Sequence, residues 1–196
     1  MDSFDNYLSA SLAVLAETRE RLAPALVERA IAIMVDALAA DKPLLICGNG
    51  GSAADSMHIA GELVGRFLKD RRALRAIALA ADPAILTAWG NDVAYDDVFA
   101  RQVYAYGEPG GVLLGISTSG RSKNVLAAAR AAKAKGMSVI SLTGQGGGLL
   151  SPLTDVLLDV PSTMTPFIQQ VHICLYHYLC AEIEQRIMAR GIVHAE

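Results

Sequence analysis

Five short apolar runs recur from residue 42 onwards, separated by stretches with helical spacing. The runs are PLLIC, LRAIALA, GVLLGIS, MSVISLT and DVLLDVP. Runs that are apolar on both faces are typical of buried parallel strands. Between and after them, apolar residues at helical spacing predict helices near 53–67, 82–89, 95–106, 122–135 and about 165–190. This alternation predicts an α/β fold with a doubly wound, five-stranded parallel sheet flanked by helices.

Helical patterns also stand at both ends of the chain. Residues about 4–40 contain two of them, divided near Pro24, which suits the first turn of a helix. The last helix begins with FIQQVHICLYHYLCAEI, which is apolar nearly all round and must be buried on most sides. We therefore expect this helix and the helical prefix to form contacts between subunits. No repeat or linker divides the chain, so residues 1–196 are predicted to be one domain.

Composition narrows the classes of protein to consider. The chain is 53% hydrophobic and 19% charged, with a mean hydropathy of +0.34, but no apolar run reaches the roughly 18 residues of a membrane span. The start, MDSFDNYL, has two aspartates and no basic residue, unlike a secretory signal, so we expect a cytoplasmic protein without a membrane partner. A net charge of -3 and the lack of a Lys/Arg block argue against nucleic acid. Cys47, Cys174 and Cys180 lie in apolar stretches and are predicted to be buried free thiols.

Two polar loops follow predicted strands, at the edge of a parallel sheet where ligands bind. The first, GNGGSAAD, offers close backbone approach and a helix N-terminus that favours an anion. Its spacing Gly48-x-Gly50-x-x-Ala53 fits a relaxed dinucleotide fingerprint. However, the acid that closes the second strand, Asp82, lies about 30 positions on instead of about 20, so no nucleotide cofactor is expected.

The second loop, GISTSGRS, carries four hydroxyl side chains beside a helix start: Ser117, Thr118, Ser119 and Ser122. Hydroxyl and backbone donors at such a place can surround a phosphate without a cation. The alternative is ordinary N-capping by Ser119 or Ser122. Four hydroxyls in six positions favour a phosphomonoester site.

Potential acid, base or metal-binding groups occur on two predicted helices. His58 and Glu62 are four residues apart and share one helix face, where they either meet one ligand or metal ion or form a solvated pair. The last helix adds Gln169, Gln170, His172 and His177. Helical geometry does not select among these four. The two histidines are about 140° apart around the axis, and Gln170 aligns with His177 better than Gln169 does.

The motifs GNGGSAADSMHIAGE, WGND, GISTSGRSKN and TPFIQQVHICLYH together resemble the sugar isomerase (SIS) domain family and, within it, the phosphoheptose isomerases. The resemblance covers almost the whole chain. It implies conversion of sedoheptulose 7-phosphate into D-glycero-D-manno-heptose 7-phosphate, the first step towards the activated heptoses of surface polysaccharides, by a homotetramer with sites between subunits. It also implies phosphate binding by Ser117, Thr118, Ser119 and Ser122, and sugar contacts from Asn49, Gly50, Gly51, Ser52, Glu62, Asn91, Asp92 and Gln169.

The resemblance further assigns chemistry to four residues. Glu62 would be the base and His177 the acid of an enediol mechanism, and some family members bind one zinc ion per subunit through positions matching His58, Glu62, Gln169 and His177. A Glu62 held tightly by zinc is a poorer base, so it either leaves the metal during turnover or the zinc mainly organises the site. His172 is interpreted as supporting, and Pro166 stands where certain members have an aspartate, so no acid is assigned there.

Two other functions remain open at this point. One is a non-catalytic SIS protein that binds a phosphosugar or a protein partner, such as the relative that associates with a replication initiator. The other is an isomerase for a different sugar phosphate. The presence of both Glu62 and His177 favours an enzyme, because a binding module has no need of a base and an acid.

Overall fold

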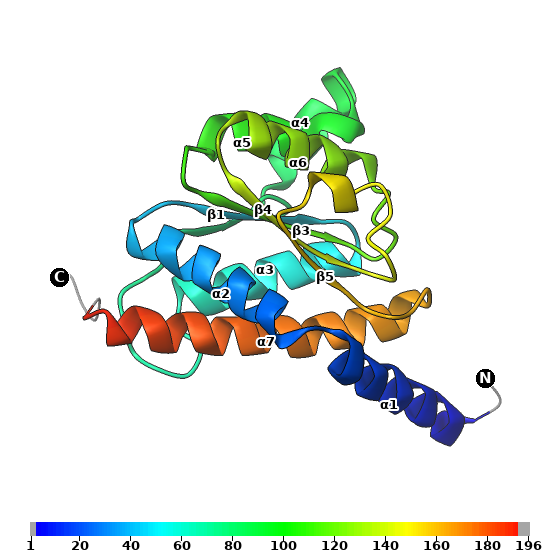
Figure 1. The fold of residues 1–196 in the computed structure, drawn as a ribbon. Helices are drawn as coiled ribbons and strands as arrows, with labels where there is room; N and C mark the ends of the chain where they lie inside the picture. The colour runs from blue at the N-terminus through cyan, green and yellow to red at the C-terminus, as the bar shows by residue number, and fades with distance from the viewer. Residues whose placement is uncertain (1–2, 192–196) are drawn as a thin grey trace.

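The computed structural model describes residues 3–191, and helices and strands alternate in it along the chain (Figure 1). Its elements, in order, are α1 (Phe4–Arg21), α2 (Pro24–Ala39), β1 (Leu44–Gly48), α3 (Gly51–Val64), β2 (Ala76–Ala78), α4 (Pro83–Asp92), the 3-10 turn η1 (Tyr95–Asp97), α5 (Val98–Tyr106), β3 (Val112–Ser117), α6 (Lys123–Ala134), β4 (Ser138–Thr143), the 3-10 turn η2 (Ser151–Leu153), β5 (Val156–Asp159) and α7 (Thr165–Ala189).

In residues 3–191 the strands form one parallel sheet of five, in the order β2-β1-β3-β4-β5. The order reverses at β1, as in a doubly wound fold, and this confirms the predicted fold class. Figure 1 shows α4, α5 and α6 on one face of the sheet and α2, α3 and α7 on the other.

Each face of the sheet has its own hydrophobic core, which explains the apolar runs in the sequence. Along β1, Leu44 and Ile46 point into the core formed with α2, α3 and α7, whereas Leu45 and Cys47 point into the core formed with α5 and α6. All four side chains are fully buried. The edge strands depart from this pattern, because alternate residues of β2 and β5 are only partly buried.

The helical prefix divides as predicted, with Pro24 in the first turn of α2. Figure 1 shows α1 reaching beyond the body of the fold along the start of α7. Its buried residues are only Ser11 and Thr18. The apolar side chains of Phe4, Leu8 and Leu12 are exposed.

An apolar groove of about 590 Å³ lies between α1, α2 and α7. Cys174 lines it and is exposed, so the prediction of three buried thiols is wrong for this residue and confirmed for Cys47 and Cys180. The side of α7 that bears Cys174, together with Ile173 and Tyr178, is uncovered in the single chain. No helix within residues 3–191 is both long and apolar enough to span a bilayer.

Helix α3 ends at Val64, three residues earlier than the pattern predicted. The side chain of a buried arginine forms hydrogen bonds with the last carbonyl groups of the helix. The guanidinium of Arg71 donates hydrogen bonds to the backbone oxygens of Glu62 at 2.8 Å and of Leu63 and Gly65 at 2.9 Å. These carbonyls have no partner within the helix itself. Arg71 thus fixes the end of the helix that carries Glu62.

The charge of Arg71 is balanced by Glu184 of α7, 3.4 Å away, and both side chains are almost completely buried. The Glu184 carboxylate also accepts hydrogen bonds from the backbone N–H groups of Phe67, Leu68 and Lys69, at 3.1, 2.8 and 2.8 Å. The pair therefore ties the segment after α3 to α7.

We expect Glu184→Gln to lower the free energy of unfolding by about 3–5 kcal/mol, because it leaves the Arg71 charge buried without a partner. Chemical denaturation at equilibrium measures this change. Glu28→Gln is the matched control, since Glu28 of α2 forms an exposed ion pair with Arg186, which lies on α7 like Glu184. A loss below about 1 kcal/mol for Glu184→Gln would contradict the structural role of the pair.

Candidate functional site

The loop after β1 is held by a pair of amide side chains. Asn49 and Asn124 exchange two hydrogen bonds, at 2.9 and 2.8 Å, and the hydroxyl of Tyr95 donates to Oδ1 of Asn49 at 3.0 Å. Asn124 is buried at the start of α6, so the pair joins the first polar loop to the second. Neither Asn124 nor Tyr95 was assigned a role from the sequence. The only signal for Asn124 was its place just after the serine-rich loop.

The serine-rich loop after β3 holds three of its hydroxyl groups in hydrogen bonds within the loop. Ser117 and Ser122 share a hydrogen bond of 3.0 Å between their Oγ atoms, and Ser119 Oγ accepts one from the backbone N–H of Arg121. Ser122 is the N-cap residue of α6, but its side chain makes no capping hydrogen bond. The capping alternative therefore does not account for Ser122. A cleft of about 310 Å³ next to the loop is lined by Thr118, Ser119, Arg121, Gln145, Gly148, Ser162 and Thr163.

This loop is also packed backbone to backbone against the segment after β4. Gly120 has a φ of 61°, and a Cβ atom there would collide with the carbonyl oxygen of Gly147. The carbonyl oxygen of Gly120 accepts a hydrogen bond from the N–H of Leu150 at 3.0 Å. Only a glycine at position 120 lets the two segments approach this closely.

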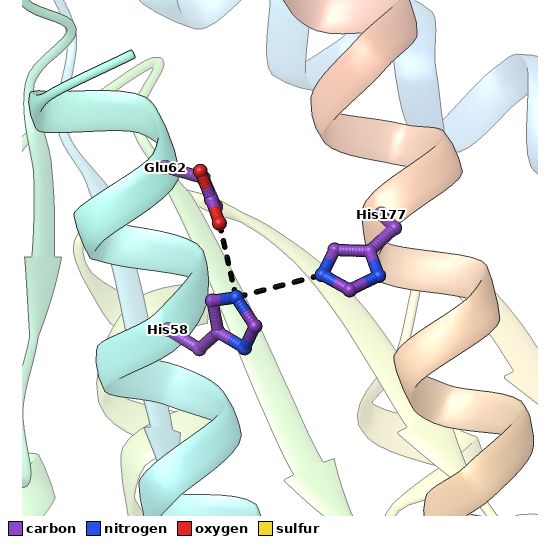
Figure 2. A group of neighbouring side chains, drawn as sticks. All are labelled: His58, Glu62 and His177. Carbon is purple, nitrogen blue, oxygen red and sulfur yellow. Dashed lines mark hydrogen bonds and ion pairs between the residues drawn. The ribbon is translucent and has the colours of Figure 1, made fainter. Parts of the chain in front are cut away.

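His58 and Glu62 on α3 face His177 on α7 (Figure 2). His58 Nε2 lies 3.0 Å from Glu62 Oε1 and 3.5 Å from His177 Nε2. The three potential ligand atoms all lie within 4.8 Å of one another. The side chain of His58 is 45% exposed and that of Glu62 is 21% exposed, so the group is open to solvent in the single chain.

The nitrogen and oxygen atoms of this group need a hydrogen atom or a metal ion between them. A carboxylate oxygen is only an acceptor, and a neutral imidazole nitrogen without hydrogen is one too, so either a proton or a metal ion must separate them. Around a tetrahedral zinc ion with bonds of about 2.0–2.1 Å, neighbouring ligand atoms lie about 3.3 Å apart. The distances of 3.0 and 3.5 Å from His58 Nε2 lie on either side of this value, so two of the three separations, together with the nitrogen and oxygen donor types, fit a zinc ion.

Aromatic side chains surround the two histidines. Phe67 stacks on His177, with ring centroids 5.5 Å apart and planes 14° from parallel. Phe67 belongs to the segment tied to Glu184, so the orientation of His177 depends on that segment. The hydroxyl of Tyr176 lies 3.0 Å from His58 Nδ1. Neither aromatic residue was selected from the sequence, because each looks like an ordinary core residue there.

Gln169 and Gln170, between which helical spacing could not choose, have different neighbours in the structure. Gln169 lies against Gly51 at the start of α3, where a Cβ atom on Gly51 would collide with its amide. Gln170 instead bonds Tyr7 and Ser11 of α1. In the described residues Gln169 makes no hydrogen bond to the group of His58, Glu62 and His177. Gly51 and His58 are seven residues apart, about 10 Å along α3.

The remaining predicted residues lie at the end of α4, at the start of α3 and in the core. Asn91 and Asp92 are exposed at the end of α4 and bond each other at 2.9 Å. Ser52 is buried in the first turn of α3. His172 is fully buried and its Nε2 lies 3.1 Å from the carbonyl oxygen of Thr143, which fits a supporting role.

Comparison with known proteins gives one consistent family. Residues 6–144 match the model described as SIS domain. Phosphoheptose isomerase of Crocosphaera subtropica is 48% identical over 169 residues, which are 86% of each chain. The solved phosphoheptose isomerase of Neisseria gonorrhoeae is 42% identical with a TM-score of 0.87, covering 92% of this chain and 96% of that one. That of Francisella tularensis is 38% identical with a TM-score of 0.90, covering 94% and 97%.

Burial lowers the pKa of His172 to about 4, so this histidine should make stability depend on pH. Below about pH 6.5 the unfolded chain binds a proton at this residue and the native chain does not, so stability falls between about pH 6.5 and 4 and is complete above. We expect His172→Leu to remove this part of the pH slope in denaturant unfolding. An NMR titration of His172 with a midpoint near 6.5 in the folded protein would contradict the assignment.

Proposed function

The chain belongs to the phosphoheptose isomerases of the SIS domain family, and on this premise we propose that it converts sedoheptulose 7-phosphate into D-glycero-D-manno-heptose 7-phosphate. The observation that carries the proposal is the placement of Glu62 and His177 on facing helices beside His58. The whole chain would then be a single SIS domain. We also propose a cytoplasmic location. Its product would be the first intermediate towards activated heptose.

The reaction moves a carbonyl group from C2 to C1, and the residue types match what that requires. A base must take the proton from C1, a donor must protonate the oxygen, and the enediol between them must be stabilised. Glu62 is proposed as the base and His177 as the acid that shuttles the second proton. The Phe67 ring holds the His177 imidazole at a fixed angle for this transfer.

Binding of the rest of the substrate is assigned to the strand ends. The hydroxyl groups of Ser117, Thr118, Ser119 and Ser122 are proposed to hold the phosphate, and this is supported by the shared hydrogen bond between Ser117 and Ser122 and by the adjoining cleft. Sugar hydroxyls would be bound by Asn49, Gly50, Gly51, Ser52, Asn91, Asp92 and Gln169.

The length of α3 supports the prediction that sites lie between subunits of a homotetramer. Gly51 begins the helix at the strand ends, and Glu62 lies eleven residues later, about 16 Å along the axis. The extended substrate measures only about 10 Å from C1 to phosphorus, given bonds near 1.5 Å. We propose that the serine-rich loop of one chain and the Glu62–His177 pair of another share one substrate. The exposed apolar faces of α1 and α7 are available for this assembly.

Zinc is proposed as the metal, held by His58, Glu62 and His177 with Gln169 as fourth ligand. The support is the nitrogen and oxygen donor set and its spacing. Gln169 of the same chain would have to leave Gly51 to reach it. A bound zinc ion would act as a Lewis acid towards the substrate oxygens. Glu62 would then serve as base when it is not a ligand.

We expect Glu62→Gln and His177→Ala each to lower kcat for sedoheptulose 7-phosphate by about 10²–10⁴-fold, the usual contribution of one acid or base. A coupled assay of the heptose product measures this, with circular dichroism and gel filtration as checks of fold and assembly. Glu182→Gln on α7 is the control and should keep full activity.

The same assay measures the preference for substrate. Sedoheptulose 7-phosphate should be turned over far faster than fructose 6-phosphate or ribulose 5-phosphate. Full activity in either variant overturns the mechanism, and no turnover of the heptulose phosphate overturns the substrate.

Metal analysis of protein purified without chelator should find about one zinc ion per chain. Gln169→Ala tests the part played by Gln169, because it removes the amide oxygen that is proposed to bind the metal. The fold should be kept, since the lost group is the end of a flexible side chain that lies against the start of α3. We expect this variant to bind zinc more weakly, and equal zinc content at limiting metal would remove Gln169 from the ligand set.

A further inference from the structure

A buried acid and a buried tyrosine stand behind His58, on the side away from Glu62. Tyr176 of α7 is 1% exposed and Asp55 of α3 is 8% exposed. The Tyr176 hydroxyl lies 3.0 Å from His58 Nδ1 and 3.5 Å from Asp55 Oδ1. The other carboxylate oxygen of Asp55 is buried and has no hydrogen-bond partner. A buried carboxylate that is so weakly satisfied calls for an explanation.

The direction of the hydrogen bonds between His58, Tyr176 and Asp55 depends on what His58 Nε2 binds. When a proton on Nε2 bridges His58 to Glu62, the neutral ring has a bare Nδ1, which accepts the hydrogen of Tyr176. When a metal ion occupies that place, Nε2 must give its lone pair to the metal and the ring hydrogen sits on Nδ1. Tyr176 must then accept from Nδ1, and its own hydrogen needs another acceptor. Asp55 is the side chain placed to provide one.

We propose that Tyr176 and Asp55 are positioning residues that let His58 switch between these two states. When a divalent cation binds, the hydrogen of the tyrosine hydroxyl turns from His58 towards Asp55, while its oxygen stays beside His58. A hydroxyl group can do this because it both donates and accepts, whereas a carboxylate in direct contact would fix His58 in one tautomer. The pair explains how one site holds a proton or a metal ion without moving its helices. This inference rests on the zinc part of the proposed function.

The test measures the affinity of the assembled full-length protein for Zn²⁺ alone, by competition with a chromophoric chelator. Tyr176→Phe removes one oxygen atom from a packed ring and should weaken zinc binding by about 10–100-fold, as loss of an outer partner of a ligating histidine does. Asp55→Asn keeps an oxygen that accepts from Tyr176, so it should lose less than Tyr176→Phe. Tyr104→Phe, at an exposed tyrosine of α5 on the other face of the sheet, is the control and should bind like the wild type.

A second measurement separates positioning from simple packing. In zinc-loaded wild type, ¹⁵N NMR should place the ring hydrogen of His58 on Nδ1 with slow solvent exchange, and in loaded Tyr176→Phe this hydrogen should exchange faster. If Tyr176→Phe does not assemble, Asp55→Ala, which keeps the tyrosine, should show the weaker zinc binding.

The outcomes are distinct for the two proposals. Equal zinc affinity, within twofold, in the wild type and an assembled Tyr176→Phe would overturn the inference and leave the proposed function intact. A wild type that isomerises the sugar but binds no zinc would contradict the zinc part of that function, and this inference with it.

Discussion

The buried ion pair between Arg71 and Glu184 is the interaction on which the arrangement of α3 and α7 depends. Arg71 closes the end of α3 just after Glu62, and Glu184 anchors the following segment to α7. Phe67 in that segment stacks on His177. A charged pair in a dry interior stabilises little by itself, but breaking it is costly, so such a pair specifies one geometry. Here that geometry sets the relative position of a carboxylate and an imidazole from different helices.

The proposed phosphate-binding groups lie at the edge of the sheet where α3 begins, and the proposed acid and base groups lie further along or beside that helix. Parallel strands direct the serine-rich loop and the Asn49 loop to one edge of the sheet, where helix N-termini favour a phosphate. Helix α3 then runs back along the sheet and carries His58 and Glu62 away from that edge. Because the substrate is shorter than this helix, the proposed assembly would bring the two sets of groups together, and the apolar face of α7 would then serve the site as well as stability.

The sheet was predictable from the sequence because central parallel strands bury both faces and leave continuous apolar runs. The end of α3 was not, since Glu184 stands more than a hundred residues after the segment it anchors. The spacing along α7 did not select a partner for His177, although Gln170 aligns with it better than Gln169 does. The resemblance selected Gln169, and the structure shows Gln170 bonded to α1 instead. A helical wheel gives the angle of a side chain but not the neighbour that it meets. Cys174 was misjudged for the same reason, because its apolar surroundings border a groove that one chain leaves open.

The contact of Gly120 with Gly147 has an evolutionary consequence. Neither residue has a side chain that binds a ligand, yet a methyl group at position 120 would push the serine-rich loop away from its neighbour. Natural variation at Gly120 should therefore be as restricted as at the serines themselves, and drift at one of these two segments should be accompanied by change in the other. A catalogue of residues that touch substrate would miss this position, because its constraint comes from the packing of one backbone segment against another.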